Sequence, residues 1–186
     1  MTVTALDPKT ALIVIDLQKG LVCLPSIHSI KGVVAHVCTM AAAFRDQGLP
    51  VVLVNVAGAP AVRTEQRRRN HALPEGWTDL IPELNQQPQD LVVMKYTPGA
   101  FTNTGLEAHL RALEVTQVVI VGVATSNGVE VTARQAYELG FNVTFATDAM
   151  TDVDAGAHAY SVTRVFPKIG ETGTTQEIIN LMKRSA

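Results

Sequence analysis

Five short, almost continuously apolar runs recur along the chain at intervals of a few tens of residues. They cover residues 11–15, 51–54, 91–94, 117–121 and 142–146. Successive side chains of a strand point to opposite faces of its sheet, so a run that is apolar at every position is typical of a strand buried on both faces. The pattern therefore predicts the strands of a parallel sheet.

Segments with helical spacing of apolar residues separate these runs, at residues 30–47, 104–113, 129–139 and 155–165. Gly48 and Gly140 stand where glycine commonly ends a helix. A last short strand near residues 166–169 and a helix at about residues 174–183 are expected to complete the fold. The alternation predicts an α/β fold in which right-handed crossovers place helices on both faces of the sheet.

Residues 56–90 break the pattern, because this segment is long, weakly periodic and punctuated by prolines. A loop of that length in a compact domain is usually functional. We expect it to cover the active site or to mediate subunit contacts, with Trp77 and Leu80 packed inward. Its three consecutive arginines, residues 67–69, have two interpretations: a solvated loop or first helical turn, or a contact for a substrate anion.

The composition narrows the class of protein. The chain has 186 residues, 47% of them hydrophobic and 17% charged, which suits one compact domain spanning residues 1–186. A formal charge of −2 gives no general attraction for nucleic acid or an anionic membrane. Cys23 and Cys38 are too few and too unpatterned for a disulfide scaffold or a structural zinc site. With no signal-peptide pattern and no run of membrane-spanning length, we expect a cytoplasmic protein.

Candidate chemistry lies at the ends of three predicted strands. Asp16 follows the first run, Lys95 follows the third, and residues 126–128 come shortly after the fourth. In open α/β sheets, ligands bind at the carboxyl ends of the strands, near the point where the strand order reverses. Taken singly, Asp16 is equally well a helix cap or turn former, and Lys95 a strand-end lysine that reaches water. As a pair, the lysine would hold the carboxylate ionised or make it a proton carrier, and it could also clamp a substrate carboxylate.

Five stretches carry a family resemblance: IDLQKG, KYTPGAF, GVATSNGVEVTAR, NVTFATDAM and RVFPKIGE. With them the chain resembles the isochorismatase-like hydrolases, whose cysteine members attack amides and whose true isochorismatases lack the thiol. The resemblance implies a three-layer Rossmann-like fold with a six-stranded parallel sheet, and a pocket that contains Asp16 and Lys95. It also implies a homo-oligomer that helps to seal the pocket, and a non-proline cis peptide between Val123 and Ala124.

Gly128 stands where the cysteine members usually carry their nucleophile. A residue without a side chain cannot form a covalent acyl intermediate, so the implied catalytic set is Asp16, Lys95 and the position of Gly128. For substrate binding we expect Gln18, Phe101, Ala124, Thr125 and Asn127.

Two of these binding residues have a second interpretation. Gln18 matches the D-x-Q pattern of the family and would orient Asp16 or bind substrate, or else satisfy the backbone of its loop. Phe101 is a pocket wall or part of the core.

Two hydrolytic mechanisms remain without a thiol. In the first, which resembles true isochorismatases, protonated Asp16 donates a proton to a substrate vinyl ether, water attacks the oxocarbenium carbon, and Lys95 holds the substrate carboxylate. In the second, Asp16 is the general base for water attack on an amide or ester, and backbone N–H groups around Ala124 and Gly128 hold the oxyanion.

Isochorismate specificity stays open. True isochorismatases carry an aromatic residue and a histidine where this chain has residues 124–126, and a glutamine where it has Ala57. The alternative from another class of protein is a catalytically silent relative that binds a small metabolite or a protein partner.

Other candidate residues are weaker. Cys23 could replace the missing nucleophile, but its apolar neighbours favour a small buried hydrophobe. His71 and Asp79 lack the spacing of the metal-dependent amidases of this superfamily, and the other histidines are scattered at positions 28, 36, 109 and 158, so we expect no metal and no cofactor. The acidic run of Asp148, Asp152 and Asp154 is expected to cap the next helix and to make turn contacts.

Overall fold

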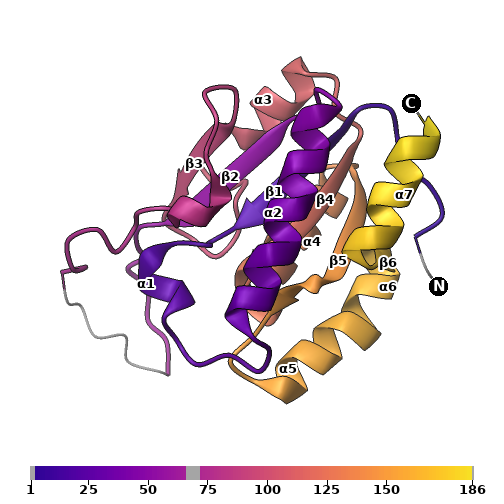
Figure 1. Ribbon diagram of the computed structural model, residues 1–186. Helices are drawn as coiled ribbons and strands as arrows, with labels where there is room; N and C mark the ends of the chain where they lie inside the picture. Colours follow the sequence, from indigo (N-terminus) through magenta and orange to yellow (C-terminus); the bar gives the residue numbers. More distant parts are fainter. Residues whose placement is uncertain (1–2, 66–71, 186) are drawn as a thin grey trace.

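The computed structural model describes residues 3–65 and 72–185, and its core is one six-stranded parallel sheet (Figure 1). The strands are β1 (Thr10–Ile15), β2 (Val51–Val56), β3 (Leu91–Lys95), β4 (Gln117–Val123), β5 (Asn142–Thr151) and β6 (Glu171–Gly173). Their order across the sheet is β3-β2-β1-β4-β5-β6, so the direction of winding reverses between β1 and β4. The predicted fold class is confirmed, and the reversal marks the edge where a ligand site is expected.

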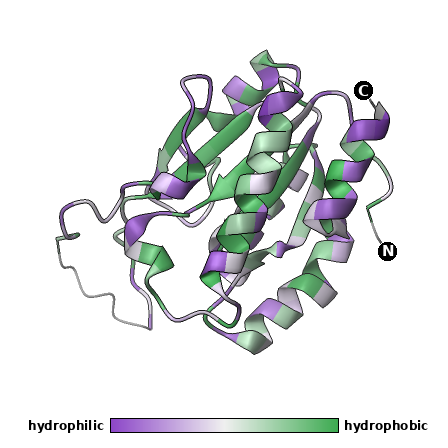
Figure 2. Cartoon of the chain, in the orientation of Figure 1, coloured by the Kyte–Doolittle hydropathy of each residue, from purple (hydrophilic) through white to green (hydrophobic). Residues whose placement is uncertain are grey.

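Helices cover both faces of the sheet (Figure 1). Buried side chains of α2 (Ile30–Asp46) and α7 (Thr175–Ser185) pack on one face, and those of α3 (Leu106–Ala112) and α4 (Glu130–Glu138) on the other. Along β1, Leu12 and Val14 belong to the first core, whereas Ile13 and Ile15 belong to the second. The apolar run is continuous because each face has its own core, and the strands form an apolar centre in Figure 2.

The shorter elements lie in the connections between the strands and the longer helices. These are the helix α1 (Lys19–Val22), the 3₁₀ turn η1 (Pro82–Leu84), the π turns η2 (Thr125–Val129) and η3 (Ser161–Val165), and the helices α5 (Ala155–Tyr160) and α6 (Phe166–Ile169). No helix of the described residues combines the length and the apolar character needed to cross a bilayer.

The predicted strand near residues 166–169 is wrong, since these residues form α6, which continues the helical path of α5 and η3. Phe166 is fully buried and stacks on Phe145 of β5 at a ring-centroid distance of 3.8 Å, so its apolar character serves helix packing. The strand begins only after Gly170, where a Cβ would lie 2.3 Å from the carbonyl oxygen of Val143. That close approach brings the chain beside β5 and starts β6.

The expectation that every apolar run is buried on both faces is wrong for β3. Val92 and Met94 are 43% and 45% exposed, while Val93 between them is buried. β3 is one of the two edge strands of the sheet, and one of its faces is left uncovered. β5 also continues to Thr151, well beyond the predicted end of its apolar run.

The long segment after β2 returns to the body of the protein near α1. Leu80 forms an antiparallel bridge with Gln18 and packs against the core, as expected. Trp77 is half-buried over Gly20, where a Cβ would lie 2.1 Å from the indole nitrogen. The three arginines 67–69 and His71 lie outside the described residues.

Candidate active site

Two charged side chains meet at the carboxyl edge of the sheet. Asp16 follows β1 and Lys95 ends β3, with β2 between the two strands. The Nζ atom of Lys95 donates to Oδ2 of Asp16 at 2.8 Å and to the carbonyl oxygen of Pro98 at 2.8 Å. Asp16 is 4% exposed and Lys95 is 1% exposed. The topology thus forms a buried ion pair from residues 79 positions apart in sequence.

Burial dominates the electrostatics of this pair. It raises the pKa of Asp16 from 3.8 to about 6, although the nearby Lys95 ammonium acts in the opposite direction. The second carboxylate oxygen, Oδ1, is buried and has no hydrogen-bond partner among the described residues. Asp16 also adopts a positive φ of 54°, which for a non-glycine residue is uncommon and frequent at functional sites. A carboxyl group with a pKa near 6 can accept or release a proton close to neutral pH.

A cavity of about 380 Å³ adjoins the pair. Its lining includes the expected residues Asp16, Lys95, Ala124, Asn127 and Gly128. The last three belong to the turn between β4 and α4, which follows a cis peptide bond between Val123 and Ala124. Apolar side chains from α1 and the segment after it complete the wall together with the ends of β2 and β4. The structure therefore brings five of the eight candidate site residues to one cavity.

Gly128 packs directly against β1. A Cβ at this position would lie 2.9 Å from Cγ2 of Ile15, 3.0 Å from Oδ2 of Asp16 and 3.2 Å from the carbonyl oxygen of Val123. Contacts this short require the neighbouring atoms to shift. The absence of a side chain at Gly128 therefore permits the observed position of the Asp16 carboxylate.

Gln18 and Phe101 do not line the cavity. The side-chain amide of Gln18 donates to the carbonyl oxygens of Val56 and Trp77 and accepts from the N–H of Val56, so it ties β2 to the long loop. Phe101 packs against Phe141, with ring centroids 6.0 Å apart. Their contacts match the alternatives, a backbone-satisfying glutamine and a core phenylalanine, and substrate binding by these two residues stays a prediction.

Thr125, the first residue of the η2 turn, is buried and is not part of the cavity wall. Its Oγ1 lies 2.9 Å from Nδ1 of His158 on α5, and the His158 ring meets that of His28 edge-on at 4.9 Å. The next residue, Ser126, donates its N–H to Oδ2 of Asp152 at 2.7 Å. The turn that presents Ala124, Asn127 and Gly128 is thus held by a polar cluster from three other segments.

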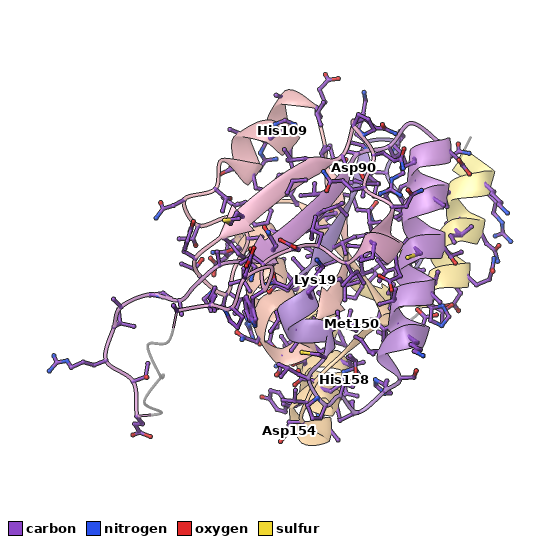
Figure 3. The ribbon with its side chains drawn as sticks, turned by 60° about the vertical axis from the view of Figure 1, so that its left-hand side comes forward. Lys19, Asp90, His109, Met150, Asp154 and His158 are labelled. Atoms are coloured by element: carbon purple, nitrogen blue, oxygen red, sulfur yellow. The ribbon has the colours of Figure 1, made fainter. Side chains whose placement is uncertain are left out.

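Sequence reasoning missed this cluster, because the histidines carry no spacing that marks them as a pair. They are 130 positions apart, and only the fold brings them together. His158 lies close to Asp154 at one end of the molecule, whereas His109 lies at the opposite end (Figure 3). Desolvation and the neighbouring His28 lower the pKa of His158, with Asp152 acting in the opposite direction, which favours a neutral imidazole beside Thr125.

A second set of supporting residues lies on α4. Thr132 accepts a hydrogen bond from the N–H of Ala100 at 3.1 Å, and the Gln135 side chain accepts from the N–H of Phe101 at 3.1 Å. These bonds hold the loop in which the Pro98 carbonyl oxygen accepts a hydrogen bond from Lys95. In the sequence Thr132 and Gln135 look like ordinary polar helix residues, so no local signal identifies this role.

The remaining candidates lie elsewhere or serve the fold. Cys23 is exposed, so the expectation of a small buried hydrophobe is wrong. Its thiol donates to the carbonyl oxygen of Gly20 at 3.6 Å, and it is not part of the cavity wall. Asp79 pairs with Lys19 at 2.9 Å. Asp154 accepts from the N–H of Ala157 and caps α5, as expected. Within residues 3–65 and 72–185, no group of three or more His, Cys, Asp and Glu side chains could hold a metal ion.

Comparisons with known proteins agree with the observed fold. Residues 10–177 match the model of the isochorismatase domain. The chain is 36% identical over 182 residues to the uncharacterized isochorismatase family protein YwoC of Bacillus subtilis, with 94% of this chain and 95% of that protein covered. The solved structure of an isochorismatase family protein from Burkholderia thailandensis has a TM-score of 0.92 and 38% identity, and covers 96% of this chain and 98% of its own.

A more distant relative is named for its reaction. The ureidoacrylate amidohydrolase RutB of Variovorax paradoxus is 29% identical over 178 residues, with 80% of this chain and 71% of that protein covered.

Proposed function

This chain belongs to the isochorismatase family, and on that premise we propose that it hydrolyses a small-molecule amide with Asp16 and Lys95, without a cysteine nucleophile. The proposal rests on one observation, the buried Asp16–Lys95 ion pair at the wall of a cavity whose facing turn has a glycine at position 128. An amide is favoured because a relative is named as an amidohydrolase. Water then has to be the nucleophile, because no thiol lines the described part of the cavity.

In the proposed reaction Asp16 acts first as a base and then as an acid. Its carboxylate takes a proton from water while the water oxygen bonds to the amide carbon and the carbonyl electron pair moves onto oxygen. When the tetrahedral intermediate collapses, the carbonyl re-forms, the C–N bond breaks, and Asp16 returns the proton to the leaving nitrogen. The products are a carboxylic acid and ammonia or an amine. A pKa of about 6 suits a group that works in both directions near neutrality.

Lys95 holds the base and supplies positive charge. Its ammonium group fixes Oδ2 of Asp16 and lies within the same cavity wall, so it offsets negative charge that develops as water is deprotonated. The turn of residues 124–128 would supply backbone N–H groups to the oxyanion. Neither step requires a side chain at Gly128.

The test is a screen of the purified chain for ammonia release from small primary amides, with pyruvate release from isochorismate measured in parallel. Asp16→Asn should abolish turnover while ligand binding remains. The matched control is Asp79→Asn, which removes an exposed acid outside the cavity and should leave turnover unchanged. Full turnover by Asp16→Asn would refute the proposal, and binding without turnover in the wild type would indicate a silent relative instead.

The pH profile separates the two hydrolytic mechanisms. A base must be ionised, so amide hydrolysis should rise as pH increases through about 6, the pKa of Asp16. A vinyl ether requires the protonated acid, so its hydrolysis should fall over the same interval. A falling profile with pyruvate release would replace amide hydrolysis by vinyl-ether hydrolysis as the function of the site.

A further inference from the structure

The wall of the active-site cavity is mainly apolar. Its apolar side chains are Leu21, Leu24, Val56, Pro98, Val123 and Ala124, with glycines at positions 58 and 128. Of the described lining residues, only Asp16, Lys95 and Asn127 bring polar side chains. A small molecule in this cavity therefore makes most of its contacts with hydrocarbon, and its polar groups are recognised at one end.

The charges of this wall are already paired. Lys95 is the only cationic side chain in the described part of the lining, and its ammonium group binds both Oδ2 of Asp16 and the carbonyl oxygen of Pro98 at 2.8 Å. The neighbouring anion is Asp16, whose other oxygen has no partner in the described chain. The wall thus presents a neutralised ion pair with an unmet acceptor, rather than a free positive charge.

Among the described residues that line the cavity, a bound carboxylate has no counter-ion of its own. It would lose hydration on entry, and it would lie beside the Asp16 carboxylate, a like charge in a poorly solvated site. The buried pair is also unsuited to release Lys95, because Asp16 would then lose the one charged partner that it has among the described residues. An uncharged group has neither cost, and its N–H or O–H donors are compatible with a wall whose acceptor is unmet.

We propose that the site takes uncharged amides with an apolar body and discriminates against substrates that carry a carboxylate. The amide part of this inference rests on the proposed function. The selection by charge follows from the cavity and concerns binding alone. It replaces the expectation that Lys95 clamps a substrate carboxylate. It also separates this chain from a site for ureidoacrylate, the substrate in the name of the relative RutB, since that molecule carries a carboxylate.

Binding of two matched probes tests the selection. 4-Methylbenzamide and 4-carbamoylbenzoate share an aromatic amide and differ in a methyl group against a carboxylate. In calorimetric titrations of the wild-type protein at about pH 8, the neutral probe should bind about ten-fold more tightly or better. Equal or tighter binding of the carboxylate would overturn the proposal, as would failure of both probes to bind at millimolar concentration.

Two variants identify the source of the selection. Asp16→Asn removes the negative charge with little change in volume, so the preference for the neutral probe should shrink several-fold. Asp79→Asn removes an equal charge from an exposed ion pair outside the cavity and should leave the preference unchanged. A loss of preference in both variants would assign the effect to net charge and overturn the role of the cavity.

The wild type provides the same test without a substitution. Lowering the pH from about 8 to about 5 protonates Asp16 and leaves the probe carboxylate ionised, so the affinity ratio should fall. A ratio that is constant over this interval would overturn the role of Asp16. Release of ammonia is scored separately, so that neutral selection without hydrolysis rejects the proposed function and retains this inference.

Discussion

The titration of Asp16 should appear in the stability of the fold. The folded protein raises the pKa of this carboxyl group from 3.8 to about 6, chiefly because the group is buried. The folded state therefore holds the proton more tightly than the unfolded state does. Stability from this group is complete below pH 3.8 and is lost as pH rises through about 6. At about 1.4 kcal/mol for each tenfold difference in proton affinity, the total loss is about 3 kcal/mol.

Asp16→Asn isolates this contribution, because an amide of similar shape does not titrate in this range. We would measure the free energy of unfolding by urea denaturation of both proteins between about pH 3 and about pH 8, the interval that brackets the two pKa values. The free energy of the wild type minus that of the variant should fall by about 3 kcal/mol across the interval. Asp79→Asn, measured in parallel, controls for the loss of one carboxylate at an exposed position outside the cavity.

A difference that rises with pH would refute this reasoning. That sign belongs to a carboxyl group whose pKa is lowered by folding, as in a salt bridge where attraction exceeds desolvation. It would mean that Lys95 outweighs burial and that Asp16 is a permanently charged group. A poised acid or base at this position would then be excluded.

Three further substitutions probe the site, the turn beside it and a buried ion pair elsewhere in the fold by calorimetric melting. Gly128→Ala places a Cβ 2.9 Å from Ile15 and 3.0 Å from Asp16, so it should lower the free energy of unfolding by about 1–3 kcal/mol. Gly32→Ala on α2 meets nothing closer than 3.8 Å and should not destabilise the protein. His158→Phe leaves the buried Thr125 hydroxyl without its imidazole partner and should cost about 1–3 kcal/mol; an unchanged melting temperature would show that this contact is dispensable. Asp90 makes a two-point ion pair with Arg45 of α2, and the two side chains are 1% and 12% exposed. Asp90→Asn weakens this pair and should lower the free energy of unfolding by about 3 kcal/mol; a loss under 1 kcal/mol would contradict the importance of the pair.

Much of the fold is readable from the local pattern of apolar residues. Each residue of β1 faces one of two cores, so the run Ala11–Ile15 is apolar throughout and identifies a doubly covered strand. The pattern is less informative at the edge of the sheet and after α5. β3 has an apolar sequence but one exposed face, and residues 166–169 are apolar because Phe166 packs as part of a helix.

The site divides in the same way. Asp16 and Lys95 could be proposed from sequence, because each stands at the carboxyl end of an apolar run and parallel strands bring their carboxyl ends to one edge. The tertiary structure decided that Gln18 serves the backbone, that Phe101 packs in the core, and that His158 supports the turn. Those roles depend on which partners lie within hydrogen-bond or packing distance.

The sequence by itself therefore determined the alternating α/β architecture and the polar residues available at the strand ends. These follow from periodicity, which is a local property of the chain. Only the tertiary structure decided the burial of Asp16, the pairing that occupies Lys95, and the close packing around Gly128. Burial and pairing arise from contacts between residues far apart in sequence, and they set the proton affinity of the carboxyl group and the charge that the cavity presents to a ligand.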